Sequence, residues 1–415
     1  MSMLRSVLAV ALIGTAAAGI SMGVVTAVSA AEQGGQQLSV GVAKALKAAQ
    51  DATKKGQWNV ALEKIKEAQA QSGKTAYDEY QIDNFLAYVL FSQKKMGEAA
   101  VVYERMLNSG QMPANEVPTR TQSLAQMFFQ LKQYDKAIKY SKQLYDKNPG
   151  NQDAALVLGQ AYYLSNDYKN AAATMSALAT RVERAGQKPK EDWLRLVYDS
   201  YTKLNDKAGA TEALKKLVRH YNKPDDWSTL LANVRGKGSD RVDLGYFRLM
   251  REAGVLKRDR DYYEFAQLAM DEKVGNAPIE AVQIIQEGMD NGILKSDDKA
   301  QQGRYDRLFQ AAKQRAEAMK KQLPQLAKQT EAAASGQADV ALGQAYLGAG
   351  DYDAAIAALQ RGIKRGGVTD VDEAQIDLGV AYLKKGQKDQ ARQAFRAVSK
   401  DSEWSTLAEL WSLRV

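Results

Sequence analysis

The sequence contains no cysteine among its 415 residues and a single histidine, His220. Without cysteine, structural disulfides, thiolate nucleophiles, iron–sulfur clusters and thiolate zinc sites are excluded in any compartment. With one histidine, the usual zinc sites and nucleophile–base pairs cannot be assembled. His220 lies near the expected end of a helix, where a cation is favoured electrostatically, so we interpret it as structural. We therefore expect no metal, no cofactor and no catalytic site.

Proline is also scarce, with 7 residues, whereas alanine, lysine, glutamine, glutamate and leucine recur throughout. These are mostly the residues that cost least in a helix. Hydrophobic residues make up 45% of the chain and charged residues 26%, which is close to the values of ordinary soluble proteins. The composition predicts an all-α chain, most of which folds.

Only the amino terminus carries a long apolar run. Arg5 precedes an uncharged stretch from Val7 to Ile20, and Ala30 and Ala31 supply small residues as a signal peptidase requires. We predict a signal peptide over 1–31, export to the periplasm and no stable membrane span after cleavage. The alternative is an uncleaved anchor, because a span needs roughly 20 residues. A lipoprotein is excluded, since acylation requires a cysteine.

Two short phrases recur along the chain. Leu-Gly-Gln-Ala-Tyr stands at 158–162 and again at 342–346, and a close copy stands at 378–382. Each is followed by a polar turn, an alanine and a large residue four positions on, as in Ala171 and Met175. Leucine and tyrosine four apart share one face of a helix, and the small residue between them lets a second helix approach closely. The two phrases predict a helical hairpin.

These residues and their spacing resemble the tetratricopeptide repeat, whose period is about 34 residues. The resemblance spans almost the whole chain after residue 39. It implies an α-solenoid of stacked hairpins that forms a right-handed superhelix, with the first helices on the concave face. The order of regular and degenerate repeats also resembles uncharacterised proteobacterial periplasmic members of this family, some of them associated with TonB-type systems.

The same phrases predict how the chain is divided. Pro324 should end a helix, because proline removes a backbone hydrogen bond, so we expect a boundary at Leu323, with a change of curvature or a hinge there. Acidic residues such as Asp298 and Asp351 open predicted helices, so we interpret them as caps. The predicted segments are a linker over 32–39, an amino-terminal array of about five repeats over 40–224, degenerate helical repeats with a long charged helix over 225–335, two carboxy-terminal repeats over 336–400 and a capping helix over 401–415.

A ligand surface is expected on the outward side of the first helices. Its mix of amides and aromatic rings suits an extended peptide, because amides pair with the backbone and rings cover side chains. The alternative is that these residues pack against neighbouring hairpins. The predicted partner-binding groove consists of Asn84, Tyr88, Phe91, Gln122, Gln126, Phe129, Gln130, Gln160, Tyr163 and Leu164.

The sequence therefore favours a non-catalytic periplasmic scaffold that binds a protein or extended peptide in an envelope transport or assembly complex. The formal net charge of +8 indicates either a surface that attracts acidic partners or a solvated helical surface rich in lysine. The alternative is thus a module that binds an anionic envelope polymer, such as peptidoglycan or an anionic glycan, through the basic stretch from Arg304 to Lys328. Only Tyr305 and Phe309 supply aromatic rings there, so no nucleic-acid partner is expected. An enzyme is the third and least favoured hypothesis, because the predicted repeats leave no room for a catalytic domain.

Overall fold

The computed structural model describes residues 37–236 and 238–415, and every regular element in these two stretches is an α-helix. The predicted all-helical fold is confirmed, and it is consistent with an α-solenoid. None of the described helices is both long and apolar enough to cross a membrane. The helices are α2 (Val40–Lys54), α3 (Trp58–Gln69), α4 (Ala76–Ser92), α5 (Met96–Asn108), α6 (Val117–Gln130), α7 (Tyr134–Lys147), α8 (Gln152–Leu164), α9 (Tyr168–Arg184), α10 (Glu191–Lys203), α11 (Lys207–Tyr221), α12 (Pro224–Val234), α13 (Asp240–Glu252), α14 (Asp259–Met270), α15 (Pro278–Asp290), α16 (Lys299–Glu331), α17 (Gln337–Ala349), α18 (Tyr352–Arg365), α19 (Val371–Lys384), α20 (Lys388–Arg396) and α21 (Ser405–Ser412).

The chain forms two compact units, which divide between Ala210 and Thr211. Unit 1 holds α2 to α10, unit 2 holds α12 to α21, and α11 crosses the division. The predicted amino-terminal array ends at residue 224. Pro224 is the first residue of α12, so this predicted boundary lies just inside that helix. Proline is tolerated there, since the N–H groups of a first helical turn have no partner within the helix.

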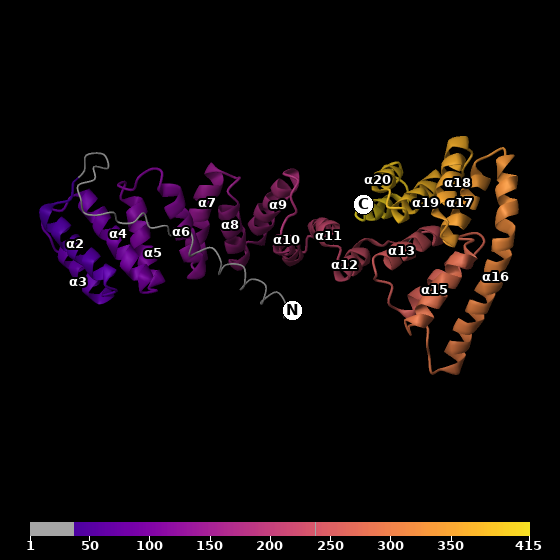
Figure 1. Cartoon of the computed structure of the whole chain (residues 1–415), viewed down its shortest axis with the longest axis horizontal. Coiled ribbons are helices and arrows are strands. Elements are labelled where there is room, and N and C mark those ends of the chain that lie inside the picture. Colours follow the sequence, from indigo (N-terminus) through magenta and orange to yellow (C-terminus); the bar gives the residue numbers. More distant parts are fainter. Residues whose placement is uncertain (1–36, 237) are drawn as a thin grey trace. The chain divides into compact units, whose positions relative to one another are not determined.

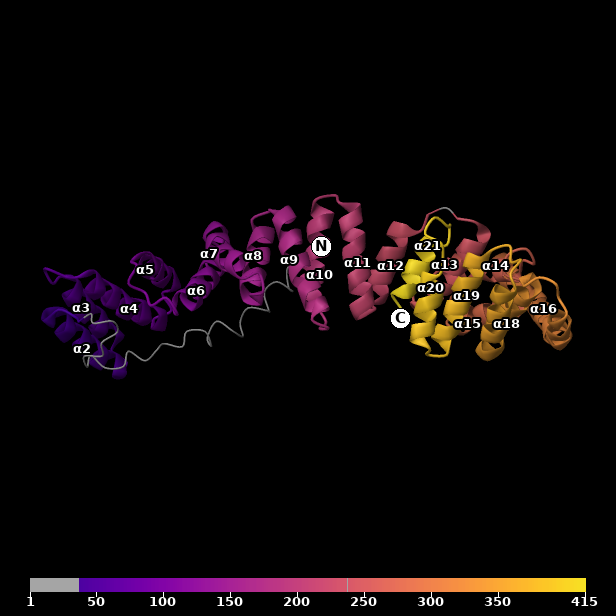
Figure 2. The ribbon, with the colours of Figure 1, turned by 90° about the horizontal axis from the view of Figure 1, so that it is seen from above.

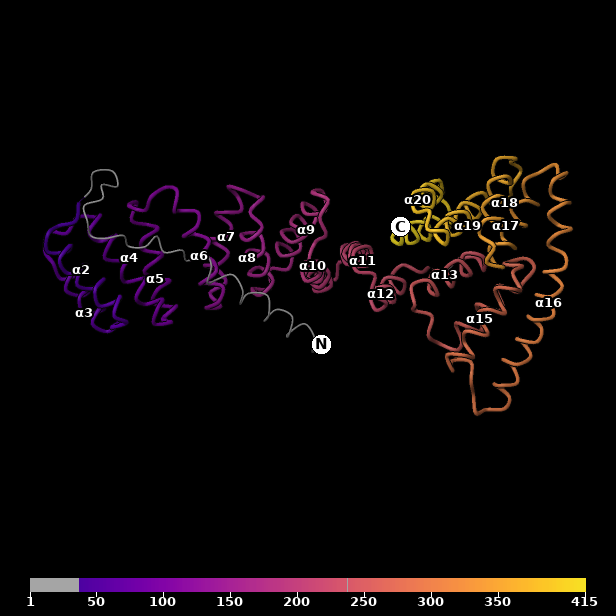
Figure 3. The backbone as a smooth tube through the Cα atoms, viewed as in Figure 1, coloured from indigo at the N-terminus to yellow at the C-terminus, as the bar shows by residue number. Residues whose placement is uncertain are grey.

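Unit 1 is a row of helical hairpins. Helix α2 packs with α3, α4 with α5, α6 with α7 and α8 with α9, and the tube in Figure 3 shows these helices one after another. The first helices of neighbouring hairpins also touch, α2 with α4, α6 with α8 and α8 with α10. Within each of these pairs the first helices lie side by side, as the repeat pattern predicts.

The signal peptide predicted over 1–31 lies outside the described residues, and only the end of the predicted linker is described. The N–H and the hydroxyl of Ser39 donate hydrogen bonds of 2.9 Å and 2.6 Å to the Asp78 carboxylate. Asp78 also closes a capping box with Thr75 at the start of α4. The last linker residue is thus tied to the second hairpin.

Glycines stand where the two helices of a hairpin approach most closely. A Cβ added to any of the three glycines of the repeated phrase would lie 2.6 Å from a carbon of the second helix, well inside the carbon contact distance of about 3.5 to 4.0 Å. The close approach inferred from the sequence is therefore confirmed. The three pairs are Gly159 with Met175, Gly343 with Leu359 and Gly379 with Phe395.

Gly379→Ala should destabilise unit 2 by about 1 to 3 kcal/mol, because the Phe395 ring has no room to yield to an added methyl group. Gly97→Ala in α5 is the matched control, since its new Cβ would meet only Leu131, at 3.9 Å. There the better helix propensity of alanine should add up to about 1 kcal/mol. Thermal unfolding of both variants measures the difference. Equal effects of the two substitutions would contradict the close approach.

The helix boundary predicted at Leu323 is wrong, because α16 runs without a break through Pro324. Leu323 is buried, and with Met319 it packs into a cluster that includes Leu342 and Ala345. Pro324 itself faces solvent. Burial on the inner side of α16 thus offsets the backbone hydrogen bond that the proline removes.

Unit 2 closes on itself through its last helix. Helix α21 packs against α20, its neighbour in sequence, and also against α13. A Cβ added to Gly245 of α13 would clash with the Leu407 side chain of α21, and Arg414 pairs with Glu252 at 3.3 Å. The helix predicted to cap the array within 401–415 is present as α21, but it covers α13 as well as the last repeat.

Candidate partner-binding surface

The ten predicted groove residues all lie on α4, α6 and α8, the first helices of three consecutive hairpins (Figure 1). We call their outward side the first-helix face of unit 1. Gln130 is exposed, Phe129 and Gln160 are buried, and the other seven residues are half-buried. The predicted groove is therefore only partly open to solvent.

The apolar residues of this face are mostly used for packing. Phe129 belongs to the core cluster of unit 1, and Phe91 and Leu164 pack against it. The Tyr88 ring meets Trp58 edge-on, with 6.0 Å between the ring centroids. The contacts of these four side chains are therefore packing contacts between hairpins.

The Tyr163 side chain makes a polar contact within unit 1. Its hydroxyl donates a hydrogen bond to the Asp199 carboxylate of α10, and its ring lies 5.4 Å from that of Tyr168. Burial, together with the bond to this carboxylate, raises the pKa of Tyr163 above its usual value. A neutral Tyr163 thus joins α8 to α9 and α10.

The amides of the face lack partners. Both amide atoms of Gln122 and Oε1 of Gln160 are shielded from solvent without a hydrogen bond inside the described ranges. Asn84, Gln126 and Gln130 likewise make no side-chain hydrogen bond to any described residue. An unpaired buried amide costs about 1 to 3 kcal/mol. Asn84, Gln126 and Gln130, which are not fully buried, are where an incoming peptide backbone can add hydrogen bonds.

The corresponding face of unit 2 is covered by the chain itself. Lys384 holds the same position in its repeat as Gln130 does in unit 1. Each follows the small residue of its first helix, Gly379 or Ala125, by five residues. In unit 2 this position is occupied, because Lys384 pairs with Glu252 of α13. Helix α13 therefore lies on the side of α19 that the repeat pattern assigns to a ligand.

A network of five charged side chains holds α13 there. Arg248 donates to Glu280 from Nε at 3.1 Å and from Nη2 at 2.8 Å, and its Nη1 lies 3.3 Å from Asp377. Arg241 pairs with Glu373 at 2.5 Å. Sequence reasoning missed this network. The one local signal was a pair of acidic residues, Glu373 and Asp377, four apart in a largely apolar helix.

The network should give unit 2 an unusual dependence on pH. Burial, followed by repulsion from Asp377, raises the pKa of Glu373 from 4.5 to about 7. The folded unit therefore binds this proton more tightly than the unfolded chain does, so its contribution to stability is lost as the pH rises through about 7. Glu373→Gln, which removes the charge, should gain in Tm relative to the wild type as the pH is raised from about 5 to about 8.

Glu252→Gln is the control for this titration. Burial raises the pKa of Glu252, but bonds from Lys384 and Arg414 outweigh it, and the net shift is downward. The ionised form is thus favoured by folding, and its titration lies below about pH 4.5. Glu252→Gln should therefore have a lower Tm than the wild type by a nearly constant amount between about pH 5 and about pH 8. Thermal unfolding in a series of buffers measures both variants. Parallel curves for Glu373→Gln and the wild type would contradict the raised pKa.

The acidic residues interpreted as caps do act as caps. The Asp298 carboxylate accepts from the backbone N–H of Ala300 at 2.7 Å, and that of Asp351 accepts from Ala354 at 3.1 Å. His220 is the next-to-last residue of α11, as predicted. Across residues 37–236 and 238–415, no three histidine, aspartate or glutamate side chains come together in a way that would hold a metal ion.

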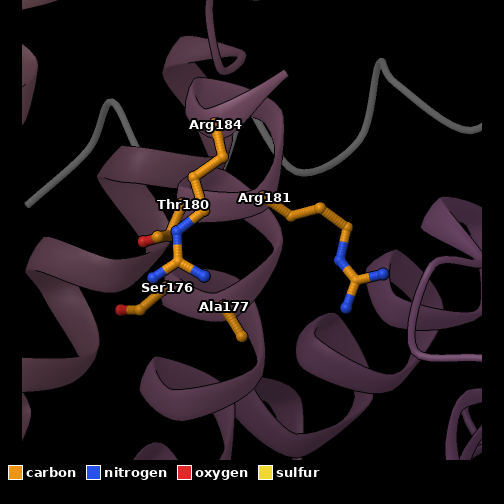
Figure 4. A pocket seen from close by; sticks show the side chains of 5 residues that line it. All are labelled: Ser176, Ala177, Thr180, Arg181 and Arg184. Carbon is orange, nitrogen blue, oxygen red and sulfur yellow. The ribbon is translucent and has the colours of Figure 1, made fainter. Parts of the chain in front are cut away.

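A hollow of about 470 Å³ lies along α9 and was not predicted. Ser176, Ala177, Thr180, Arg181 and Arg184 line it, and Figure 4 shows that all five project from this one helix. Arg181 and Arg184 are exposed. The hollow is therefore an open basic surface on the second helix of a hairpin, away from the first-helix face.

Three stretches of the chain match family models described as tetratricopeptide repeat. Residues 46–114 and 340–402 match one model, and residues 128–185 match another. These stretches cover less than half of the chain, and each of them is similar to tetratricopeptide repeats. The resemblance inferred from the repeated phrases is confirmed at this level, and the matched repeats occur in both units.

Solved structures of repeat proteins resemble the chain at low identity, and no curated protein matches it. A tetratricopeptide repeat protein from Parabacteroides merdae is 13% identical over 91% of this chain and 99% of its own, with a TM-score of 0.32. A thermophilic repeat protein from Thermus thermophilus is 15% identical over 55% of this chain and 98% of its own, with a TM-score of 0.24. The TPR2AB domain of yeast Sti1, in its complex with pHSP90, is 13% identical over 72% and 99%, with a TM-score of 0.24.

Proposed function

We propose that this chain is a non-catalytic scaffold of the cell envelope, exported to the periplasm, which binds an extended segment of a partner protein on the first-helix face of unit 1. The observation that carries the proposal is the contrast between the two units. In unit 2 helix α13 covers this face, whereas in unit 1 Asn84, Gln126 and Gln130 keep their amides unbonded within the described chain. The repeat matches support it, because tetratricopeptide repeats generally mediate protein–protein interaction.

The chemistry of the face favours a peptide backbone over a charged terminus. None of the ten residues is charged, whereas each peptide unit of an extended segment offers one donor and one acceptor. Glutamine and asparagine provide both functions in one side chain. Because one such hydrogen bond contributes about 0.5 to 1.5 kcal/mol, a partner should span several hairpins to bind firmly.

Export is supported by the apolar run after Arg5 and by the small residues Ala30 and Ala31. A role in envelope transport or assembly, including TonB-type systems, is supported by the resemblance of the repeat order. Intact mass measured on protein from the periplasmic fraction should show the loss of residues 1–30 or 1–31. Full-length protein retained in the membrane fraction would contradict this part of the proposal.

Photo-crosslinking should test the binding face directly. A photoreactive amino acid at Gln126 or Gln130 should capture the same partner in cells. The same residue at Gln143, an exposed glutamine on the second helix of that hairpin, is the matched control and should not capture it. Gln126→Ala should weaken binding by about fivefold, the value of one hydrogen bond. Capture from Gln143 as efficient as from Gln130 would rule out this face.

A further inference from the structure

Helix α16 carries much of the positive charge of the molecule. It is 33 residues long, and it contains eight lysines and arginines against three acidic residues, a net charge of +5. The whole chain has a formal net charge of +8. We call six of these cations the basic face of α16, namely Lys299, Arg304, Arg307, Lys313, Lys321 and Lys328.

The six cations of the basic face are exposed and have no acidic partner, although Lys313 Nζ lies 3.9 Å from the centre of the Phe309 ring. All six are exposed to solvent, and none forms an ion pair with any residue of the described ranges. The remaining two basic residues of the helix are engaged. Lys320 pairs with Glu317 at 2.9 Å, and Arg315 donates to the backbone oxygen of Met270 at 3.1 Å.

Four of the six cations share one direction, and Lys313 and Arg304 lie on either side of them. At 3.6 residues per turn, Lys299, Arg307, Lys321 and Lys328 fall within about 80° of one another, opposite the buried side chains of the helix. Between Arg304 and Lys328 the helix rises by about 36 Å. Figures 1 and 2 both show α16 at the edge of unit 2. The cations thus form a straight ridge rather than the wall of a groove.

We propose that the basic face of α16 docks on a membrane surface rich in anionic phospholipid headgroups. A flat layer of negative charge matches a straight ridge of cations, and each lysine or arginine near such a surface strengthens binding by about fivefold. The face holds no large apolar side chain, because Tyr305 and Phe309 are 2% and 8% exposed. The helix therefore lies on the headgroups and does not insert among the acyl chains.

Other polyanions fit the ridge less well. Single-stranded nucleic acid is bound through aromatic rings that stack on bases, and both rings of this stretch are buried. An acidic protein segment is usually held by a complementary surface with a buried centre, which a single exposed helix does not provide. The proposal is independent of the first-helix face of unit 1.

Vesicle sedimentation of the full chain tests the proposal. The chain should bind vesicles of phosphatidylcholine with about one third phosphatidylglycerol much more tightly than pure phosphatidylcholine vesicles. Replacing Arg307, Lys321 and Lys328 with Gln should weaken binding by about a hundredfold, at about fivefold per cation. Raising the salt from about 0.05 M to about 0.5 M should release the wild type, because the screening length shortens.

The matched control removes the same charge from another place. Lys44, Lys47 and Lys66 are exposed residues of unit 1 without ion pairs to described residues, and replacing them with Gln should leave binding nearly unchanged. The apolar run at the amino terminus is present in all three proteins, so it cannot produce a difference between them. Equal losses in the two triple variants, or binding to soluble anionic polysaccharide, nucleic acid or sacculi without binding to vesicles, would overturn the proposal.

Discussion

Arg248→Met should lower the free energy of unfolding of unit 2 by about 3 to 5 kcal/mol, the usual effect of removing one partner from a buried ionic network. The side chains of Arg248, Glu280 and Asp377 are only 13%, 11% and 4% exposed. Methionine fills much of the space of arginine but leaves two carboxylates without their shared cation. Denaturant unfolding of the full chain, followed by a probe within unit 2, measures the loss.

Arg251→Met provides the comparison on the same helix. Arg251 pairs with Glu287 at 2.8 Å, but the two side chains are 34% and 32% exposed. A solvated pair of this kind contributes about 0 to 1 kcal/mol. Adding Glu280→Gln and Asp377→Asn to Arg248→Met should restore part of the lost stability, because the orphaned charges are then removed. If Arg248→Met costs no more than Arg251→Met, the network does not hold α13.

Leu407→Ala should destabilise unit 2 by about 2 to 5 kcal/mol and should loosen α13 together with α21. Leu407 is fully buried and lies against Gly245 of α13, so its truncation leaves a cavity between helices far apart in sequence. Amide hydrogen exchange should show faster exchange in Asp240–Glu252 as well as in Ser405–Ser412.

Leu359→Ala is the matched substitution, because Leu359 is also fully buried but lies in the α17–α18 hairpin, against Gly343. It should lower protection first in that hairpin. The two variants therefore separate a general loss of stability from loss of the closing contact. Fraying of α21 with full protection of α13 would show that the last helix is only an end cap.

The hairpins were predictable because their signal is local. Gly159 and Met175, or Gly379 and Phe395, lie 16 residues apart, and their spacing directly encodes the contact between two consecutive helices. Caps such as Asp298 are readable for the same reason, since the bonded groups are two or three residues away. Predictions of this kind depend on no distant part of the chain.

The position of α13 was not predictable by such reasoning. Arg248 and Asp377 are 129 residues apart, and no local spacing connects them. The helix end predicted at Pro324 was wrong for a related reason. Burial of the neighbouring Leu323 outweighed the tendency of proline to end a helix. The predicted groove could be derived from the sequence only in part. Its side chains were assigned to the correct helices, but whether Phe129 packed or faced solvent depended on how neighbouring hairpins stack.

The closure of unit 2 has a consequence for the order in which the chain folds. Glu403 bonds Ser239 across 164 positions, and Arg414 bonds Glu252 across 162, whereas Ser39 and Asp78 of unit 1 are 39 apart. Distant contacts require loop entropy to be lost before they form, and they slow folding. Unit 1 can form hairpin by hairpin during synthesis. Helix α13 can complete its contacts only after α19 and α21 have been made, and until α19 is present the ligand side of the carboxy-terminal repeats stays open to other molecules.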